Sequence, residues 1–381
     1  MKPTSPRTRI FELDALRGIA VFGMILWDFR SVSMGNFHVG GEADRVIDEV
    51  MRLTDIENTT HLVFSFLFGW GLSAQALSGK AERACPVVPL RRLGALFVIG
   101  AANLVFVIRS DFIHIYALLG FVLLLFTSLR TTTVLALAVI TVALPGIGAL
   151  VAARYLTYES YYGHAIFDSL KASHILSSTY RELVHLRAHE FVREYVHPSP
   201  YVRNLDIFAM FLFGLYAARE RLFDRLRADR TLVRTLLWGF LAAHVVGLGA
   251  LLAMRLPEIV TVLARAYAIM ALSLFYICLG LYVLRADSMS TLCRPIANVG
   301  RMAISSYLLH CLLGTTMFYG YGLALHGKLG LASGEALAVL ACAFHAVLCT
   351  WWMRRFQFGP VEWLWRSITY FRLQPLRLSA S

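Results

Sequence analysis

Ionisable side chains inside long apolar runs are the first residues of this sequence whose types and spacing allow chemistry. Asp14 and Arg17 lie three apart in FELDALRG, so one helix face carries both, close enough to pair or to hold an anionic ligand. Asp28 ends the same run and His61 opens the next one. Because a carboxylate polarises an imidazole and a neutral histidine is a general base, Asp28 and His61 predict activation of a hydroxyl or amine, as acyl transfer requires.

A second polar group interrupts the apolar sequence further along. A short break between two apolar runs contains Arg109, Asp111 and His114. This break is predicted to lie on the same side of the membrane as Asp28 and His61, where it adds a second polar wall to the site that those two residues form. His310 lies inside a later apolar run. Each of these groups also has a structural explanation, as an interfacial ion pair, a helix cap or a hydrogen bond between helices, and the sequence leaves both explanations open.

The elements that must position these groups are membrane helices. Of the 381 residues, 58% are hydrophobic and 16% charged, and the mean hydropathy is +0.62. Soluble domains are about 45–50% apolar and about 25% charged. The composition therefore predicts an all-α, polytopic integral membrane bundle of about ten transmembrane helices. The expected spans are about 12–29, 62–79, 93–108, 112–129, 132–153, 204–218, 235–254, 266–284, 303–323 and 334–353.

The net charge of +12 indicates how the chain is oriented across the membrane rather than nucleic-acid binding. No dense basic run with interleaved aromatics occurs in a soluble segment, so no nucleic-acid partner is expected. Lys and Arg are denser in the loops on the side of the N-terminus, which predicts that both termini are cytoplasmic. No spacing of His, Cys, Asp or Glu fixes a full ligand set, so no metal is expected.

The spans divide the chain into four parts. Residues 1–153 are expected to form an N-terminal membrane bundle of about five spans, and residues 204–353 a C-terminal bundle of about five. Residues 154–203, rich in Tyr and His, are expected to form an extracytoplasmic segment between them. Residues 354–381 are expected to form a cytoplasmic tail.

Several sequence blocks occur in a fixed order along nearly the whole chain. The blocks are RIFELDALRGIAVFGMILWD, HLVFSFLFGWGLSAQ, RRLGALFVIGAANLVF followed by SDFIHIYALLG, and NVGRMAISSYLLHCLLGTTMFYGYGL followed by RRFQFGPVEWLWRSITY. This ordered set is specific, and it resembles the YeiB family of bacterial polytopic membrane proteins, whose C-terminal half is a domain of unknown function, number 418.

The resemblance implies a multi-pass protein of the bacterial inner membrane. The family looks like a distant relative of transmembrane acyltransferases such as heparan-alpha-glucosaminide N-acetyltransferase. It therefore implies transfer of an acyl group, acetyl in the first instance, from cytosolic acyl-CoA to an extracytoplasmic or membrane-level hydroxyl or amine acceptor such as a sugar. Asp14 and Arg17 match the family's opening motif. The chain departs from the family at two places. His310 stands where a glutamine is common, and Thr59, Thr60 and His61 stand where a basic residue is common.

The acyltransferase hypothesis assigns roles to these residues. The base is His61 or His38, the latter in the first outer loop, and Asp28 or Asp111 orients it. Guanidinium groups match phosphate geometry, so the cytoplasmic arginines are candidates for binding acyl-CoA. The expected substrate- and cofactor-binding residues are Asp14, Arg17, Arg91, Arg92, Arg109, His114, Arg301 and His310.

Two other functions fit the same residues. A carrier for a small anionic metabolite would use the charged groups as its pathway, although no internal repeat is present. A non-catalytic membrane scaffold or sensor is the third reading. The expected partners are the lipid bilayer and a small-molecule or glycan acceptor, and a homodimer is left open.

Overall fold

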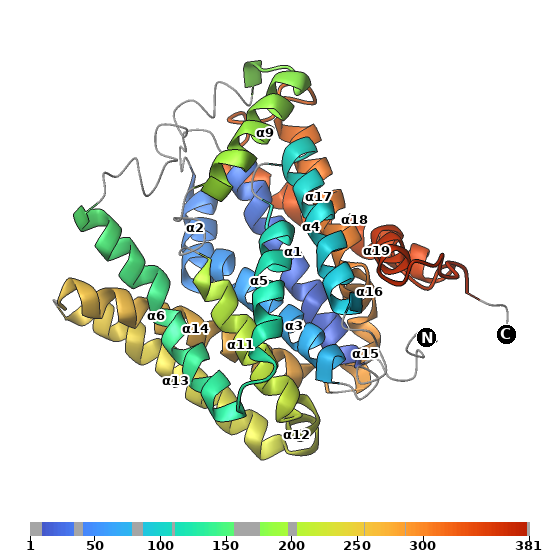
Figure 1. The fold of residues 1–381 in the computed structure, drawn as a ribbon. Coiled ribbons are helices and arrows are strands. Elements are labelled where there is room, and N and C mark those ends of the chain that lie inside the picture. The colour runs from blue at the N-terminus through green and yellow to red at the C-terminus, as the bar shows by residue number, and fades with distance from the viewer. Residues whose placement is uncertain are drawn as a thin grey trace.

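The computed structural model describes residues 10–33, 41–77, 87–108, 111–155, 176–196, 204–254, 256–285 and 287–378. Within these ranges the chain is helical apart from turns and one isolated antiparallel bridge between Phe356 and Arg377 (Figure 1). The first half contains α1 (Phe11–Ser33), α2 (Glu42–Thr54), α3 (Ile56–Leu77), α4 (Val87–Phe106), α5 (Ile113–Phe126), α6 (Thr131–Tyr155) and α9 (Tyr180–Val196). The second half contains α11 (Leu205–Arg219), α12 (Leu222–Ala228), α13 (Arg230–Ala253), α14 (Glu258–Val283), α15 (Asp287–Leu292), α16 (Arg294–Arg301), α17 (Ala303–Phe318), α18 (Leu331–Met353) and α19 (Pro360–Tyr370).

Among the described helices, five are long and apolar enough to cross a membrane, namely α4, α6, α13, α14 and α18. The pair α16 and α17 makes a sixth if it is one broken span, because the two helices meet at an angle of 88°. The all-α prediction is confirmed for the part of the chain that the structure describes. The prediction of several apolar helices of membrane-spanning length is confirmed there as well.

The helix α1 lies at the centre of the bundle, where it packs against α3, α14, α16, α17 and α18 (Figure 1). The helices α6, α13 and α14 form one side of the molecule, at the lower left of the view, and α17, α18 and α19 lie on the other. Large side chains without solvent exposure, such as Phe29 on α1 and Phe211 on α11, fill the space between the helices. The central position of α1 places its charged residues inside the protein rather than against lipid.

The helices α3 and α11 cross closely because each presents a glycine to the other. A Cβ atom at Gly69 would lie 2.5 Å from the Cα of Phe211, and one at Gly214 would lie 2.5 Å from the backbone nitrogen of Trp70. Small residues at such crossings let the two backbones approach. The LFGWG segment around Gly69 thus serves the close packing of α3 against α11.

We expect Gly69→Ala to lower the stability of the protein, because the new methyl group meets backbone atoms that cannot rotate away. The cost is about 1–3 kcal/mol. The matched control is Gly239→Ala on α13, where a Cβ would meet nothing within 4 Å. Thermal unfolding in detergent measures both variants, and equal melting temperatures would contradict the close crossing.

Candidate functional site

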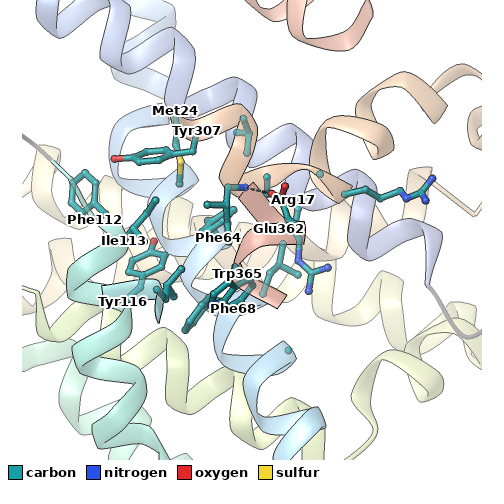
Figure 2. Close-up of a pocket in the computed structure, with 18 of the residues that line it drawn as sticks. Arg17, Met24, Phe64, Phe68, Phe112, Ile113, Tyr116, Tyr307, Glu362 and Trp365 are labelled. Atoms are coloured by element: carbon teal, nitrogen blue, oxygen red, sulfur yellow. Dashed lines mark hydrogen bonds between the residues drawn. The ribbon is translucent and has the colours of Figure 1, made fainter. Parts of the chain in front are cut away.

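A cavity of about 210 Å³ lies between α1, α3, α4, α5, α16, α17 and α19. Figure 2 shows Phe112, Ile113 and Tyr116 on one side of it and Arg17 and Glu362 on the opposite side. Most of the wall is apolar, and the charged groups gather at the end where α1, α4 and α16 carry arginines. The cavity therefore has a cationic end and an aromatic end.

The spacing of the lining residues shows which way the cavity runs. On α1 the wall is formed by Arg17, Val21 and Met24, and Asp28 continues the same face one turn further. On α4, Arg92 lines the cavity and Asn103 follows eleven residues later, as Asp28 follows Arg17. Eleven residues are about three turns and about 16 Å of helix. Both helices thus carry an arginine at one end of the cavity and a polar residue beyond the other end.

Three guanidinium groups, those of Arg17, Arg92 and Arg301, line the cationic end. Arg17 is paired with Asp14 at 3.2 Å, with a quarter of its side chain exposed. Arg92 donates to Gln75 and lies over the Trp365 ring, 4.4 Å from its centre. The arginines exceed the acidic groups at this end, which suits it to bind an anion.

The carboxylate of Glu362, on α19, caps the first turn of α17 at the same end. Its Oε1 accepts hydrogen bonds from the backbone nitrogens of Ile304 (2.8 Å) and Ser305 (3.0 Å), and its Oε2 accepts one from the Ser305 hydroxyl. These backbone donors have no partner within the helix, so a side chain must satisfy them. Burial raises the pKa of the Glu362 carboxyl, and the hydrogen bonds from Ser305 partly offset that rise.

This raised pKa predicts a pH-dependent stability. A carboxyl whose pKa is higher in the folded than in the unfolded chain contributes stability that is present below its unfolded pKa and is lost as the pH rises through its folded pKa. Gln at position 362 keeps an acceptor and does not titrate. We therefore expect the melting temperature of Glu362→Gln, relative to wild type, to increase by a few degrees between about pH 5 and about pH 8. Glu362→Ala removes the cap and costs about 1 kcal/mol or more at both pH values. A pH-independent difference for Glu362→Gln would show that Glu362 does not titrate in this way.

Beyond the aromatic end, Asp28 and His310 form a buried pair between α1 and α17. The Nε2 atom of His310 lies 2.7 Å from Oδ2 of Asp28, and the two side chains are 1% and 16% exposed. The Nδ1 atom of His310 is buried and has no hydrogen-bond partner among the described residues. If Nε2–H donates to Asp28, Nδ1 carries the lone pair, which is the form of a general base.

A second carboxylate–histidine pair lies next to the first. Oδ2 of Asp111 lies 3.0 Å from Nδ1 of His114, and its Oδ1 accepts a 2.9 Å hydrogen bond from Asn103. The Cys311 thiol connects the two pairs, since its Sγ is 3.8 Å from both Asn103 Nδ2 and His310 Nε2. All of these side chains except Asp28 are nearly fully buried. We call these six residues the polar network.

The helix α4 approaches the polar network closely because it has a glycine there. A Cβ at Gly100 would lie 2.3 Å from the backbone nitrogen of His114 and 2.8 Å from Oδ2 of Asp111. His61 lies beside the same region, with its ring centre 4.2 Å from that of Phe112. The Tyr116 hydroxyl donates to the His61 carbonyl oxygen at 3.1 Å. Because Phe112 and Tyr116 line the cavity, His61 lies one side chain away from it.

The structure brings some of the predicted residues together and separates others. It pairs Asp28 with His310 and Asp111 with His114, while Nδ1 of His61 has no hydrogen-bond partner among the described residues. Arg91 points away from the cavity and lies over the exposed Phe371 ring, at 4.3 Å. His38 and Arg109 lie outside the described residues. Within the described ranges, no group of three or more His, Cys, Asp or Glu side chains is placed to hold a metal ion.

Sequence reasoning missed Asn103, Cys311 and Glu362. The eleven-residue spacing from Arg92 to Asn103 repeats the spacing from Arg17 to Asp28 and was a usable signal for Asn103. Cys311 and Glu362 had no such signal, because both belong to the site through contacts between helices that are distant in the sequence.

Several membrane-length apolar helices, a cavity within the helical bundle and a buried histidine–carboxylate pair between α1 and α17 define the class of a multi-pass membrane protein. In such a protein, ionisable residues inside the bundle mark functional sites.

Comparison with known sequences places the chain in a family of related proteins. It is 30% identical to "Uncharacterized protein YxaH" of Bacillus subtilis (strain 168), over 99% of this chain and 98% of that protein. It is 24% identical to "Uncharacterized 39.9 kDa protein in amylase 3'region" of Bacillus acidopullulyticus, over 99% of each. A 75-residue stretch is 47% identical to "Uncharacterized protein YeiB" of Escherichia coli (strain K12), covering 19% of each chain. The family described as "Protein of unknown function (DUF418)" matches residues 217–372. The chain therefore belongs to the YxaH- and YeiB-like family.

Proposed function

We propose that this protein is a membrane acyltransferase. It takes an acyl group from cytosolic acyl-CoA and passes it to a hydroxyl or amine acceptor, such as a sugar, at the membrane level or on the extracytoplasmic side. The observation that carries the proposal is the cavity, which has three arginines at one end and buried histidine–carboxylate pairs beyond the other.

The cationic end supports binding of the phosphates of CoA. Guanidinium groups form bidentate, charge-assisted hydrogen bonds with phosphate oxygens, and Arg17, Arg92 and Arg301 come from three different helices. The Trp365 ring at this end also offers a flat face on which an adenine base can stack.

The length of the cavity axis suits the arm of CoA. The arm has twelve chain atoms between phosphate and thiol, as many as the backbone of four residues, so it spans about 14 Å when extended. The distance along α1 from Arg17 to Asp28 is about 16 Å. A donor whose phosphates bind the arginines therefore places its thioester near the polar network, and the apolar wall between them suits the uncharged arm.

The polar network supplies the groups that acyl transfer needs. A histidine oriented by a carboxylate takes the proton from the attacking hydroxyl or amine. His310, paired with Asp28, has this geometry, and the pair formed by Asp111 and His114 is a second candidate. His61 lies near enough to act at the same end, and His38 remains a candidate base.

The proposed topology follows from the same arrangement. Besides the six candidate spans, α1, α3, α5 and α11 complete the ten expected spans; α5 and α11 are short, and α1 carries ionisable site residues that lower its hydropathy. We place both termini and the arginine end in the cytoplasm, and the polar network toward the extracytoplasmic side of the inner membrane. The cytosolic donor and the outer acceptor then reach the network from opposite sides.

The experiment uses the purified full chain in nanodiscs. Isothermal titration calorimetry tests binding of acetyl-CoA and of longer acyl-CoA molecules, and a thiol reagent measures release of CoA with water, sugars and amines as acceptors. We expect saturable binding and CoA release that an acceptor accelerates. Absence of both with every acyl-CoA would overturn the proposal, and uptake of a labelled metabolite into sealed vesicles without an acyl donor would favour a carrier.

A further inference from the structure

The Cys311 thiol has an environment unlike that of the other described cysteines. It lies between the two carboxylate–histidine pairs, 3.8 Å from His310 Nε2 and 3.8 Å from Asn103 Nδ2. By contrast, Cys349 is equally buried, but its hydrogen-bond contact is the hydroxyl of Ser306. A Cys–His–Asp constellation is a recurrent arrangement for nucleophilic catalysis, in which the histidine holds the thiol proton and the carboxylate orients the histidine.

Two observations beside the thiol point to an additional group at this place. Nδ1 of His310 and Oδ1 of Asn103 are both buried and have no hydrogen-bond partner among the described residues, although buried polar atoms nearly always have one. Their residues are 1% and 3% exposed. The site is also next to the cavity, since Cys311 packs in one apolar cluster with the cavity residues Met24, Leu96, Ile113 and Tyr307.

We propose that Cys311 is an acyl carrier, which accepts the acyl group from acyl-CoA as a thioester and hands it to the acceptor. This inference rests on the proposed acyltransferase function. A covalent carrier solves a geometric problem of that function, because donor and acceptor approach from opposite sides and need not occupy the site together. The acyl group waits on the protein while CoA leaves.

The two half-reactions balance. In the first, the thiol proton goes to Nδ1 of His310, the ring nitrogen that carries the lone pair while Nε2–H donates to Asp28. The resulting imidazolium keeps Nε2 at 2.7 Å from Oδ2 of Asp28 and at 3.8 Å from the sulfur. The Cys311 thiolate attacks the thioester carbonyl, the bond from the acyl carbon to the CoA sulfur breaks, and the imidazolium proton goes to the departing CoA thiolate. In the second, the neutral imidazole takes the proton of the acceptor, the acceptor oxygen or nitrogen bonds to the acyl carbon, and Cys311 leaves as the thiolate. No oxidant or reductant is required.

The test follows the acyl group on the purified full chain in nanodiscs, with acetyl-CoA and octanoyl-CoA as probes. After an acid quench, mass spectrometry of peptides locates any added acyl group, and neutral hydroxylamine removes it if it is a thioester. We expect one acyl group on Cys311, a burst of CoA release of about one equivalent per chain, and loss of both in Cys311→Ala and Cys311→Ser. Cys349→Ala is the matched control and should keep both.

The variants should separate the carrier from a structural role. Cys311→Ala is expected to lower steady-state CoA release at least about 100-fold while changing the affinity for acyl-CoA less than about twofold, since the arginine end is untouched. If Cys311→Ala and Cys311→Ser release CoA at the wild-type rate, or if the active wild type carries no acyl group on Cys311, the carrier is wrong and direct transfer stands. If the wild type neither binds nor cleaves acyl-CoA, the acyltransferase proposal fails and the carrier fails with it.

Discussion

We expect Asp28→Asn to lower the rate of acyl-CoA cleavage by about 10³-fold and to change the affinity for acyl-CoA by less than about twofold. The carboxylate accepts a hydrogen bond from His310 Nε2 at 2.7 Å and so keeps the lone pair on Nδ1. An asparagine can present its amide N–H instead, which favours the opposite tautomer and removes the base from the reacting side. The loss should therefore appear in kcat rather than in donor binding.

His310→Gln tests the same pair from the other side. A glutamine can still donate to Asp28 and keeps a side chain of polar character between α1 and α17, but it cannot take up a proton at neutral pH. We expect a folded protein with normal donor affinity and a rate as low as that of Asp28→Asn. Because both variants disable one unit, the double variant should be no slower than either.

The control for both variants is Asp48→Asn. Asp48 is a half-exposed carboxylate that pairs with Arg30 at 2.6 Å, and neither group belongs to the polar network. Its loss removes an ion pair of similar length without touching a histidine. Rates of CoA release across the pH range, together with calorimetric donor affinity, provide the measurement. Wild-type activity in His310→Gln would exclude His310 as the base and leave His61 and the Asp111–His114 pair.

The sequence predicted the long apolar helices because long apolar runs are a local signal. It also predicted that Asp14 and Arg17 are close enough to pair, since that ion pair depends on spacing within one helix. The partner of Asp28 could not be predicted in this way. His310 lies 282 positions away, and its contact with Asp28 depends on how α1 packs against α17.

The two neighbouring arginines of α4 show the same limit. Arg91 and Arg92 are the same residue type with the same charge, and the sequence predicted the same role for both. Successive residues of a helix point about 100° apart, so packing decides which one faces the interior. Here α19 packs on α4, with Trp365 donating to the carbonyl oxygen of Arg92, and directs Arg92 toward the cavity and Arg91 toward Phe371.

That division gives a matched pair of variants for donor binding. We expect Arg92→Gln to weaken the affinity for acyl-CoA by about 10- to 100-fold, as loss of one charge-assisted contact to phosphate costs about 1.5–3 kcal/mol. Arg91→Gln removes the same charge from the same helix turn, but its side chain lies outside the cavity. Its effect should stay within about twofold, which is the size expected of a screened surface charge.

Two ligands that differ in their phosphates show whether the lost binding free energy comes from the phosphate contact or from a disturbed fold. Isothermal titration calorimetry with acetyl-CoA and with S-acetylpantetheine, which lacks the phosphates, separates the two parts of the donor. The wild type should prefer acetyl-CoA, and Arg92→Gln should lose most of that preference while binding S-acetylpantetheine as before. Arg301→Gln should behave like Arg92→Gln, because both guanidinium groups line the cationic end. If Arg91→Gln and Arg92→Gln lower the affinity for acetyl-CoA equally, the phosphates bind the outer surface of α4, and the cavity is not the donor site.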